Sequence, residues 1–372
     1  MAGMLGPART REHFDWPLFL GIVTIAIMGV VNLYSATSPY LGDPRRSGLA
    51  DIYVQQVYWL VVGGLLGIMA AVIDYRTIER FTYPLYACGV GMLVLVFWLA
   101  SDIRGSARWI ELGGFTFQPS EFMKLFVILA VARKLAEDQR TEAKTLLDLA
   151  PPALLFLLPT VLVMMQPDLG TSVIYTATAL SMMALVRVRR SSLVGLVIAL
   201  VPFTWTMWNF VLHDYQKNRV FSFLNPEADK TGTGWHAFQS RTAIGNGGVW
   251  GEGFREGTQN QFGFLPDQFS DFPFSVFAED WGFIGCIALL FVYAFVCAWA
   301  VNVASLAKDR FGAAVAIGVG AMVFWHTVFN IGMTLGILPV VGITLPLFSY
   351  GGSNVVTMLV GFGLLMNVSR RR

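Results

Sequence analysis

The stretch FLPDQFSDFPFSVFAED, residues 264–280, lies between a long polar, glycine-rich segment and one of the longest apolar runs of the chain. It carries three aspartates, one glutamate and five phenylalanines. Ionised carboxylates lose hydration at the edge of a hydrocarbon layer, so a chain that keeps them there often uses them for binding or proton transfer. The alternative is an interfacial loop whose acids face water and whose rings anchor among headgroups. Position alone slightly favours that alternative, but the rest of the sequence favours a functional site.

The composition is that of an integral membrane protein. Of the 372 residues, 55% are hydrophobic and 13% are charged, whereas a soluble domain carries about 25% charged residues. Several apolar runs approach or exceed about 20 residues, the length a helix needs to cross a bilayer. The net charge is +2, and the basic residues stand at the ends of the apolar runs rather than in one patch. No nucleic-acid partner is therefore expected, whereas membrane lipids are.

We predict an all-α polytopic membrane protein with about ten transmembrane helices in one domain, residues 1–372. A long non-hydrophobic segment, residues 213–272, separates the seventh run from the eighth. We predict it to be one large loop without regular structure, and loops of that length are usually functional. The predicted spans are residues 16–37, 54–74, 81–100, 119–134, 150–166, 169–186, 191–212, 273–304, 312–335 and 345–368.

Lys and Arg are concentrated in every second segment between the predicted spans. Because cytoplasmic loops are enriched in Lys and Arg, this pattern predicts that both termini are cytoplasmic. With this orientation, the loop 213–272 and the acidic stretch face outward. The short outer loops then hold only Arg45, Arg46, Arg104 and Arg108. The inner segments hold Arg9, Arg11, Arg76, Arg80, the basic residues of 133–144 and 187–190, Lys308, Arg310 and residues 370–372.

Two charged residues, Glu121 and Lys124, stand three apart near the start of a short span and hence on one helix face. Buried together, they neutralise each other and become less costly in the bilayer. They form either a structural ion pair or the wall of a polar cavity, and Lys124 can equally attract an anionic substrate. Asp168, in QPDLGTS, stands at a helix entrance and is predicted to be an N-cap.

Four cations flank these segments: Arg104 and Arg108 before the short span, and Lys217 and Arg219 in the long loop. Arginine forks suit phosphate recognition. Loop solvation or headgroup contact is the better interpretation of each pair alone. Phosphate recognition becomes better supported if the two pairs of cations lie close together in the fold.

Nucleotide, haem and zinc sites are not expected. The glycine-rich run of residues 243–261 has Trp250 where a nucleotide loop needs its third glycine, and the chain has no GK[ST] motif. We predict tight turns there instead. The four histidines lack ligand spacing, and His326, inside the ninth span, is predicted to be a hydrogen-bonded core residue.

Prolines and glycines interrupt the apolar run NIGMTLGILPVVGITLPLFSYGGSN, residues 330–354. Broken helices at membrane depth are tolerated where they line a cavity, and the alternative is a kinked loop between spans. If a polar cleft exists there, Ser349 and Ser353 can line it.

Asp271 is the strongest candidate for catalysis. It comes just before the eighth span, among Phe269, Phe272 and Phe274. Poor solvation should raise the pKa of its carboxyl group and suit a general base. Glu279, eight residues on, would share a face with Asp271 if one helix included both.

These motifs together resemble the SEDS family (shape, elongation, division and sporulation), and the FLNP segment with its following insert resembles the elongation (RodA-type) branch more than the division branch. The resemblance covers most of the chain. The matching segments, in family order, are RGSARWIELGGFTFQPSEFMK, QPDLGTS, RVFSFLNPEAD, AIGNGGVWGEGF with GTQ, FLPDQFSDFPFSVFAED and LPVVGITLPLFSYGGS.

The resemblance implies a peptidoglycan glycosyltransferase that polymerises glycan strands from lipid II on the outer face of the cytoplasmic (inner) membrane during elongation. A class B penicillin-binding protein would supply transpeptidation. The family's essential outer-loop aspartate falls on Asp271, and its span-four acid and lysine fall on Glu121 and Lys124. Where the family often has two glutamates, this chain has Glu279 followed by Asp280.

In chemical terms, Asp271 would take the proton of the acceptor sugar hydroxyl as it attacks C1 of the donor. Positive charge, or a divalent cation such as Mg²⁺ or Mn²⁺, would stabilise the leaving lipid pyrophosphate. The expected substrate-binding residues are Arg104, Arg108, Glu121, Lys124, Lys217, Arg219, Glu279, Ser349 and Ser353.

Two other functions compete with this one. About ten spans, an intramembrane ion pair and broken helices also suit a lipid II flippase or another transporter. A transporter, however, needs its key charges near the midplane, and the polar chemistry here is concentrated in residues 213–280. A noncatalytic scaffold of the elongation machinery would tolerate Asp271→Asn.

Overall fold

The computed structural model describes residues 14–40, 47–99, 101–103, 106–112, 115–138, 140, 142–211, 214–224, 233–265 and 267–372. This part of the chain is mostly helical, as predicted, and seven of its helices are long and apolar enough to cross a membrane. They are α1 (Trp16–Ala36), α3 (Ile52–Val72), α4 (Tyr75–Leu99), α6 (Leu146–Met165), α12 (Pro273–Ser305), α13 (Arg310–Thr334) and α14 (Gly352–Arg370). The chain is therefore a multi-pass membrane protein.

The remaining predicted spans also coincide with helices, but these are shorter or more charged. Helix α5 (Pro119–Glu137) carries Glu121 and Lys124 in its first turns. Helix α7 (Leu169–Met183) has 15 residues, and α8 (Arg190–Thr206) has 17 and continues into a π-helical turn (Met207–Val211). Two short elements, a 3₁₀ turn (Ser38–Tyr40) and α2 (Ser47–Ala50), connect α1 with α3.

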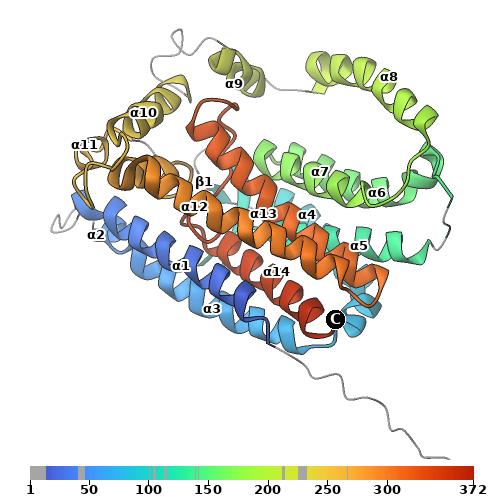
Figure 1. Cartoon of the computed structure of the whole chain (residues 1–372). Helices are drawn as coiled ribbons and strands as arrows, with labels where there is room; N and C mark the ends of the chain where they lie inside the picture. The colour runs from blue at the N-terminus through green and yellow to red at the C-terminus, as the bar shows by residue number, and fades with distance from the viewer. Residues whose placement is uncertain are drawn as a thin grey trace, which may run out of the picture.

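Helix α13 lies in the middle of the bundle, where it packs against α5, α7, α12 and α14 (Figure 1). Helix α14 runs along α3 at very short range, because glycines face each other there. A Cβ atom on Gly363 would lie only 2.1 Å from the carbonyl oxygen of Gly67. Small residues let transmembrane backbones approach in this way.

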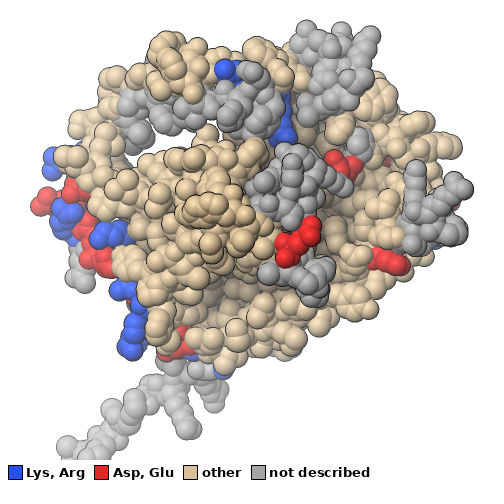
Figure 2. Space-filling view, turned by 180° about the vertical axis from the view of Figure 1, so that it is seen from behind, with Lys and Arg blue, Asp and Glu red and all other residues tan. Residues whose placement is uncertain are grey.

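On the back of the molecule, a broad area shows no charge, and a mixed cluster of charges lies along its left edge (Figure 2).

Three strands correct the all-α prediction: β1 (Ser101–Ile103), β2 (Ser106–Leu112) and β3 (Phe115–Phe117) form an antiparallel sheet in the order β1-β2-β3. In β2 and β3, Ile110 pairs with Phe117 and Leu112 with Phe115. The glycines of this segment favoured turns, but its aromatic and β-branched residues favour strands.

The predicted structureless loop of residues 213–272 is also wrong, because it contains α9 (Asp214–Leu224), α10 (Thr233–Asn246) and α11 (Thr258–Gln261). These helices are polar, so hydropathy did not reveal them. The tenth span was placed too early, since α14 begins at Gly352 and residues 345–351 form a turn and bend.

Helix α12 is broken at Gly282, whose φ of 63° and ψ of −165° are not helical. The break frees backbone groups that pair with the glycine-rich segment of residues 248–253. Glu252 N donates to Glu279 O (2.9 Å), and Phe283 N donates to Gly248 O (3.0 Å). The predicted tight turns are confirmed in the middle of the run, where Gly248, Gly251 and Gly253 have positive φ, whereas residues 243–246 and 258–261 belong to α10 and α11.

Replacing Gly282 with alanine is expected to destabilise the protein by about 2 kcal/mol or more, because only glycine populates this backbone conformation easily. The new Cβ would also lie 2.3 Å from Gly251 N. Thermal unfolding in detergent measures the loss. The matched control is Gly64→Ala on α3, where a Cβ would meet nothing within 4 Å. Equal melting temperatures for the two variants would contradict the requirement for a broken helix.

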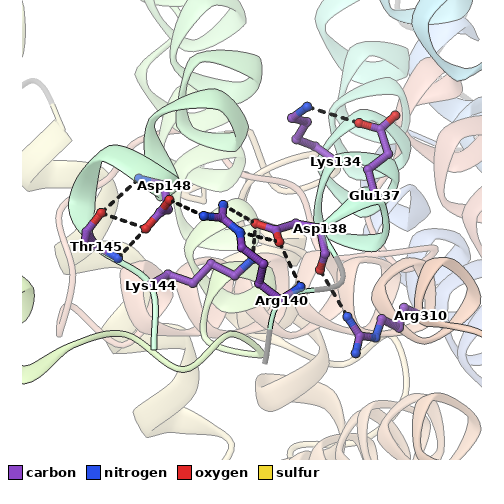
Figure 3. A network of polar contacts seen from close by, with 8 residues as sticks. All are labelled: Lys134, Glu137, Asp138, Arg140, Lys144, Thr145, Asp148 and Arg310. Carbon is purple, nitrogen blue, oxygen red and sulfur yellow. Dashed lines mark hydrogen bonds and ion pairs between the residues drawn. The ribbon is translucent and has the colours of Figure 1, made fainter. Parts of the chain in front are cut away.

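At the C-terminal end of α5, ion pairs hold the connection to α6 (Figure 3). Arg140 donates to Asp138 through Nε (3.1 Å) and Nη2 (2.9 Å) and pairs with Asp148 (3.0 Å), while Lys144 pairs with Asp138. Arg310 Nη1 donates to the Asp138 carbonyl (3.1 Å) and so joins α13 to this cluster. The charges at this end mostly satisfy one another.

Candidate functional site

Asp271 lies just outside α12, in the turn before it. Its amide donates to Asp267 O (3.0 Å). Asn330 Nδ2, from α13, donates to both Asp271 O (3.0 Å) and Ile343 O (2.7 Å). The backbone of Asp271 is thus attached to α13 and to the segment between α13 and α14, and the residue as a whole is half-buried.

The expected rise in the pKa of Asp271 is confirmed. Burial raises this pKa from the usual 3.8 to about 6, and the carboxylate of Asp267 adds to the rise. A hydrogen bond from Ser270 and the charges of Arg108 and Arg219 act in the opposite direction. Arg108 belongs to β2 and Arg219 to α9. Two of the predicted cations therefore converge on the predicted base.

Arg108 is held by Asp168, a pairing that the sequence analysis missed. Its Nη1 lies 3.3 Å from Asp168 Oδ1. The predicted N-cap is confirmed, because Asp168 accepts from Thr171 N (3.1 Å), and Gln118 Nε2 also donates to it (3.0 Å). Arg108 Nε is buried without a hydrogen-bond partner among the described residues.

The start of α7 and Asp271 meet at the segment between α13 and α14. A Cβ on Gly170, in the first turn of α7, would lie 2.8 Å from Val341 O. A Cβ on Gly342 would lie 3.4 Å from Asp271 Oδ2. This contact brings the Asp168–Arg108 pair to the same side of the molecule as Asp271.

Glu121 and Lys124 form the predicted ion pair, 2.7 Å apart and buried. Asn354 Nδ2, from α14, donates to Glu121 Oε2 (2.8 Å). Lys124 Nζ lies 3.0 Å from His326 Nε2, and His326 Nδ1 lies 2.9 Å from Thr344 O. Since the ammonium can only donate, Nε2 accepts and the ring proton is on Nδ1.

His326 is thus the hydrogen-bonded core residue that was predicted, but its partner Lys124 was not foreseen. The network joins α5, α13, α14 and the segment before α14. It ends at Thr344. The carbonyl oxygens of the neighbouring Ile343 and of Asp271 both accept from Asn330 Nδ2. Lys124, through His326, and Asp271, through Asn330, therefore reach neighbouring residues of the same short segment.

Glu279 would share a face with Asp271 only if one helix included both, and this condition is not met because α12 begins at Pro273. Asp271 precedes the helix, and Glu279 faces the glycine-rich segment instead. Its carboxylate is fully buried and accepts from Gln259 N (2.9 Å), Asn260 N (3.4 Å) and Thr258 Oγ1 (3.3 Å). Glu279 caps α11 and attaches that segment to α12.

The other predicted binding residues lie in different surroundings. Ser349 Oγ accepts from Leu345 N (2.8 Å), and Ser353 Oγ accepts from Gln118 N (3.2 Å). Lys217 lies on α9, two positions before Arg219. Arg104 lies outside the described residues.

Metal-ligand clusters of three or more His, Cys, Asp or Glu are absent from the described part of the chain. The carboxylate of Asp267 is near enough to Asp271 for its charge to raise the pKa of Asp271. A carboxylate beside bound phosphates suits a divalent cation, since Mg²⁺ commonly uses one or two carboxylates in such sites.

The site thus combines a poorly solvated carboxylate, two guanidiniums from different elements and a buried ion pair beneath the same loop. It occurs in a polytopic membrane protein, at the boundary of a spanning helix. This arrangement can move a proton next to a bound anion, which defines the class as a membrane protein with an acid–base site.

Comparison with known proteins agrees with this class. Residues 16–372 match the model of the FtsW/RodA/SpoVE family, described as a cell cycle protein. The chain is 35% identical over 371 residues to the peptidoglycan glycosyltransferase MrdB of Escherichia coli K12, covering 97% of this chain and 95% of that protein. The chain therefore belongs to the FtsW/RodA/SpoVE family, and its relatives support the RodA type within it.

Solved structures are similar over nearly the whole chain. One, described as "Structural coordination of polymerization and crosslinking by a peptidoglycan synthase complex", has a TM-score of 0.81 and 32% identity and covers 96% of this chain and 98% of the other. The crystal structure of the rod shape determining protein RodA of Thermus thermophilus has a TM-score of 0.69 and 30% identity, with 96% and 97% covered.

Proposed function

We propose that this protein polymerises glycan strands from lipid II during cell elongation, with Asp271 as the general base. The chain is a glycosyltransferase of the FtsW/RodA/SpoVE family. The observation that carries the assignment of the base is the position of Asp271 in the turn before α12, attached to α13 through Asn330, where the charges of Arg108 and Arg219 act on its carboxylate. A carboxyl group of pKa about 6 is deprotonated at neutral pH, yet basic enough to accept a proton in a transition state.

In the proposed reaction, Asp271 takes the proton of the acceptor sugar hydroxyl while that oxygen bonds to C1 of the donor sugar. The bond from C1 to the lipid diphosphate breaks, and the diphosphate leaves with the electron pair. Arg108 and Arg219 stabilise the negative charge that develops there. Lys124 and Glu121 shape the buried polar floor, and Arg104 and Lys217 remain proposed contacts to substrate, as do Ser349 and Ser353.

A divalent cation, Mg²⁺ or Mn²⁺, belongs to this proposal. Asp267 is the side chain that would hold it, together with substrate phosphates. When bound, it would neutralise part of the charge on the leaving diphosphate. The role of Glu279 in this proposal is indirect, because its carboxylate holds α11 against α12.

We propose one membrane domain, residues 1–372, with about ten spans and both termini in the cytoplasm. The basic clusters support this orientation: Arg371 pairs with Asp74 (2.7 Å), and Arg372 lies 3.5 Å from Asp15. The site would then face outward from the inner membrane, at the end of the bundle where α10 and α11 lie (Figure 1). Segment 213–272 would form the outer cover.

A class B penicillin-binding protein is the proposed partner. The support is the similarity to a peptidoglycan synthase complex that coordinates polymerisation with crosslinking. Such a partner would link strands as this protein extends them.

The proposed reaction should depend on pH through Asp271. The base works when deprotonated, and burial raises the pKa of this group to about 6. Activity should therefore fall as pH drops through about 6, rather than near the unperturbed value of 3.8. The rate of lipid II polymerisation, measured from about pH 5 to about pH 8, tests this expected fall in activity. A rate that does not change over this interval would contradict Asp271 as the base.

The proposal is tested with purified protein, its cognate penicillin-binding protein and labelled lipid II. Glycan product from the wild type supports polymerisation. Movement of labelled lipid II across vesicles without product would favour the flippase. If neither occurs and the protein still recruits its partner, the scaffold is favoured, once the divalent cation has been supplied.

A further inference from the structure

A small pocket lies between α9, α10 and the segment that follows α13, outside the residues used above except for Arg219. In Figure 1 the connection from α13 to α14 rises between α9 and α10. The cavity volume is about 20 Å³, which is room for one water-sized group, such as a single phosphate oxygen, rather than for a sugar ring. The lining residues are Arg219, Ser222, Phe223, Ala237, Arg241, Gly336, Leu338 and Val340.

Arg241 is held at this pocket by the attachment of α10 to α13. Its neighbour Ser240 donates to Thr334 O (2.7 Å) and lies 2.6 Å from Ser275 Oγ of α12. The Arg241 side chain passes over Gly336, where a Cβ would lie 3.1 Å from its Cδ. Its Nε donates to Ala237 O (3.3 Å). These contacts keep the exposed Arg241 side chain beside the pocket.

Neither arginine of the pocket forms an ion pair with a carboxylate of the described residues. Arg108 and Lys124, by contrast, are paired with Asp168 and Glu121. Two guanidinium groups that share a pocket repel each other and favour a bound anion. Their planar donor groups match the oxygens of a phosphate.

The simpler explanation is that Arg241 caps the C-terminus of α13. The last carbonyls of α13 are already satisfied, however. Ile331, Gly332 and Met333 accept from the amides of residues 335–338, and Thr334 O accepts from Ser240. No carbonyl there needs the guanidinium, so capping does not account for its position.

We propose that Arg241 and Arg219 bind a phosphate of a polyprenyl diphosphate, so that this pocket is an anion subsite for the lipid-linked sugar, separate from Arg108. The inference rests on the proposed function, because that reaction handles lipid-linked diphosphates. Arg219 belongs to both places: it lines the pocket, and its charge acts on Asp271. A diphosphate bound here would therefore lie close to the base.

The test measures binding of farnesyl diphosphate, a short polyprenyl diphosphate, to the detergent-purified full chain by calorimetry. Arg241→Ala should weaken binding about tenfold, since a hydrogen bond to a charged group is lost. Arg241→Lys should weaken it less, because the charge is kept. The matched control Lys308→Ala removes an exposed charge from the turn between α12 and α13 and should change nothing. Unchanged binding by Arg241→Ala would overturn the inference.

A bilayer headgroup has the same phosphate chemistry, so phosphatidylglycerol is titrated in parallel. Loss of phosphatidylglycerol binding in Arg241→Ala, with farnesyl diphosphate binding intact, would overturn the assignment to substrate. Polymerisation is measured separately. A wild type without product would refute the proposed function, whereas the binding comparison would still decide whether this pocket takes a diphosphate. Melting temperatures close to the wild type identify variants that are folded.

Discussion

Asp271→Asn is expected to lower the rate of glycan polymerisation by at least about 100-fold, because general bases contribute about 10²–10⁴ in rate. The amide has nearly the shape of the carboxylate but cannot accept the proton. The fold should be unaffected, since Asn330 attaches to the backbone carbonyl of residue 271 rather than to its side chain. Polymerisation is measured with labelled lipid II and the penicillin-binding partner, and melting temperature reports folding.

The matched control is Asp267→Asn, four residues earlier in the same turn. The Asp267 charge raises the pKa of Asp271. Its removal should therefore move the acidic fall in rate to lower pH. At neutral pH it should lower the rate less than Asp271→Asn does, because the proposed base remains and only a proposed cation ligand is lost. Wild-type rates in Asp271→Asn would exclude Asp271 as the base. Equal losses in both variants would assign the effect to the turn or to a bound cation.

Glu121→Gln and Lys124→Ala are each expected to destabilise the protein by about 3–5 kcal/mol, because each leaves the opposite charge buried without its partner. Both side chains are buried, and the pair is 2.7 Å apart. Thermal unfolding in detergent measures the effect. The double variant Glu121→Gln/Lys124→Met should lose less than the sum of the single losses, since no unpaired charge remains.

Helix α5 offers its own control for this experiment. Lys134 and Glu137 have the same three-residue spacing, but their side chains are 37% and 40% exposed. Lys134→Ala should cost less than about 1 kcal/mol, because water screens the pair. If the exposed and buried substitutions cost the same, burial does not govern the strength of the Glu121–Lys124 pair. If the double variant is stable but inactive, the pair serves substrate rather than folding.

The sequence was sufficient for features that depend on one segment at a time. Hydropathy located the spanning helices, because the length and apolarity of a helix are local properties. The spacing of Glu121 and Lys124 placed them on one helix face and made an ion pair one of two interpretations, and the position of Asp168 was enough to predict a cap. The phenylalanines around Asp271 indicated a poorly solvated acid for the same reason.

Polar helices and short strands were missed for a related reason. Helices α9 and α10 have no apolar run, and glycines obscured the strands of residues 101–117. Their formation depends on neighbours: Ser240 of α10, for example, bonds to Thr334 and Ser275, far away in the sequence. Local pattern contains no information about such partners.

The sequence by itself determined that this is a multi-pass membrane protein with an acidic residue at the edge of a span, since burial in lipid restricts composition along each segment. Only the tertiary structure decided which charges meet. It separated Glu279 from Asp271 by starting α12 after Asp271, and it joined Arg108 to Asp168 and Lys124 to His326. Those pairings lie between segments about 60 to 200 residues apart, where packing of whole helices, not spacing along one, brings side chains together.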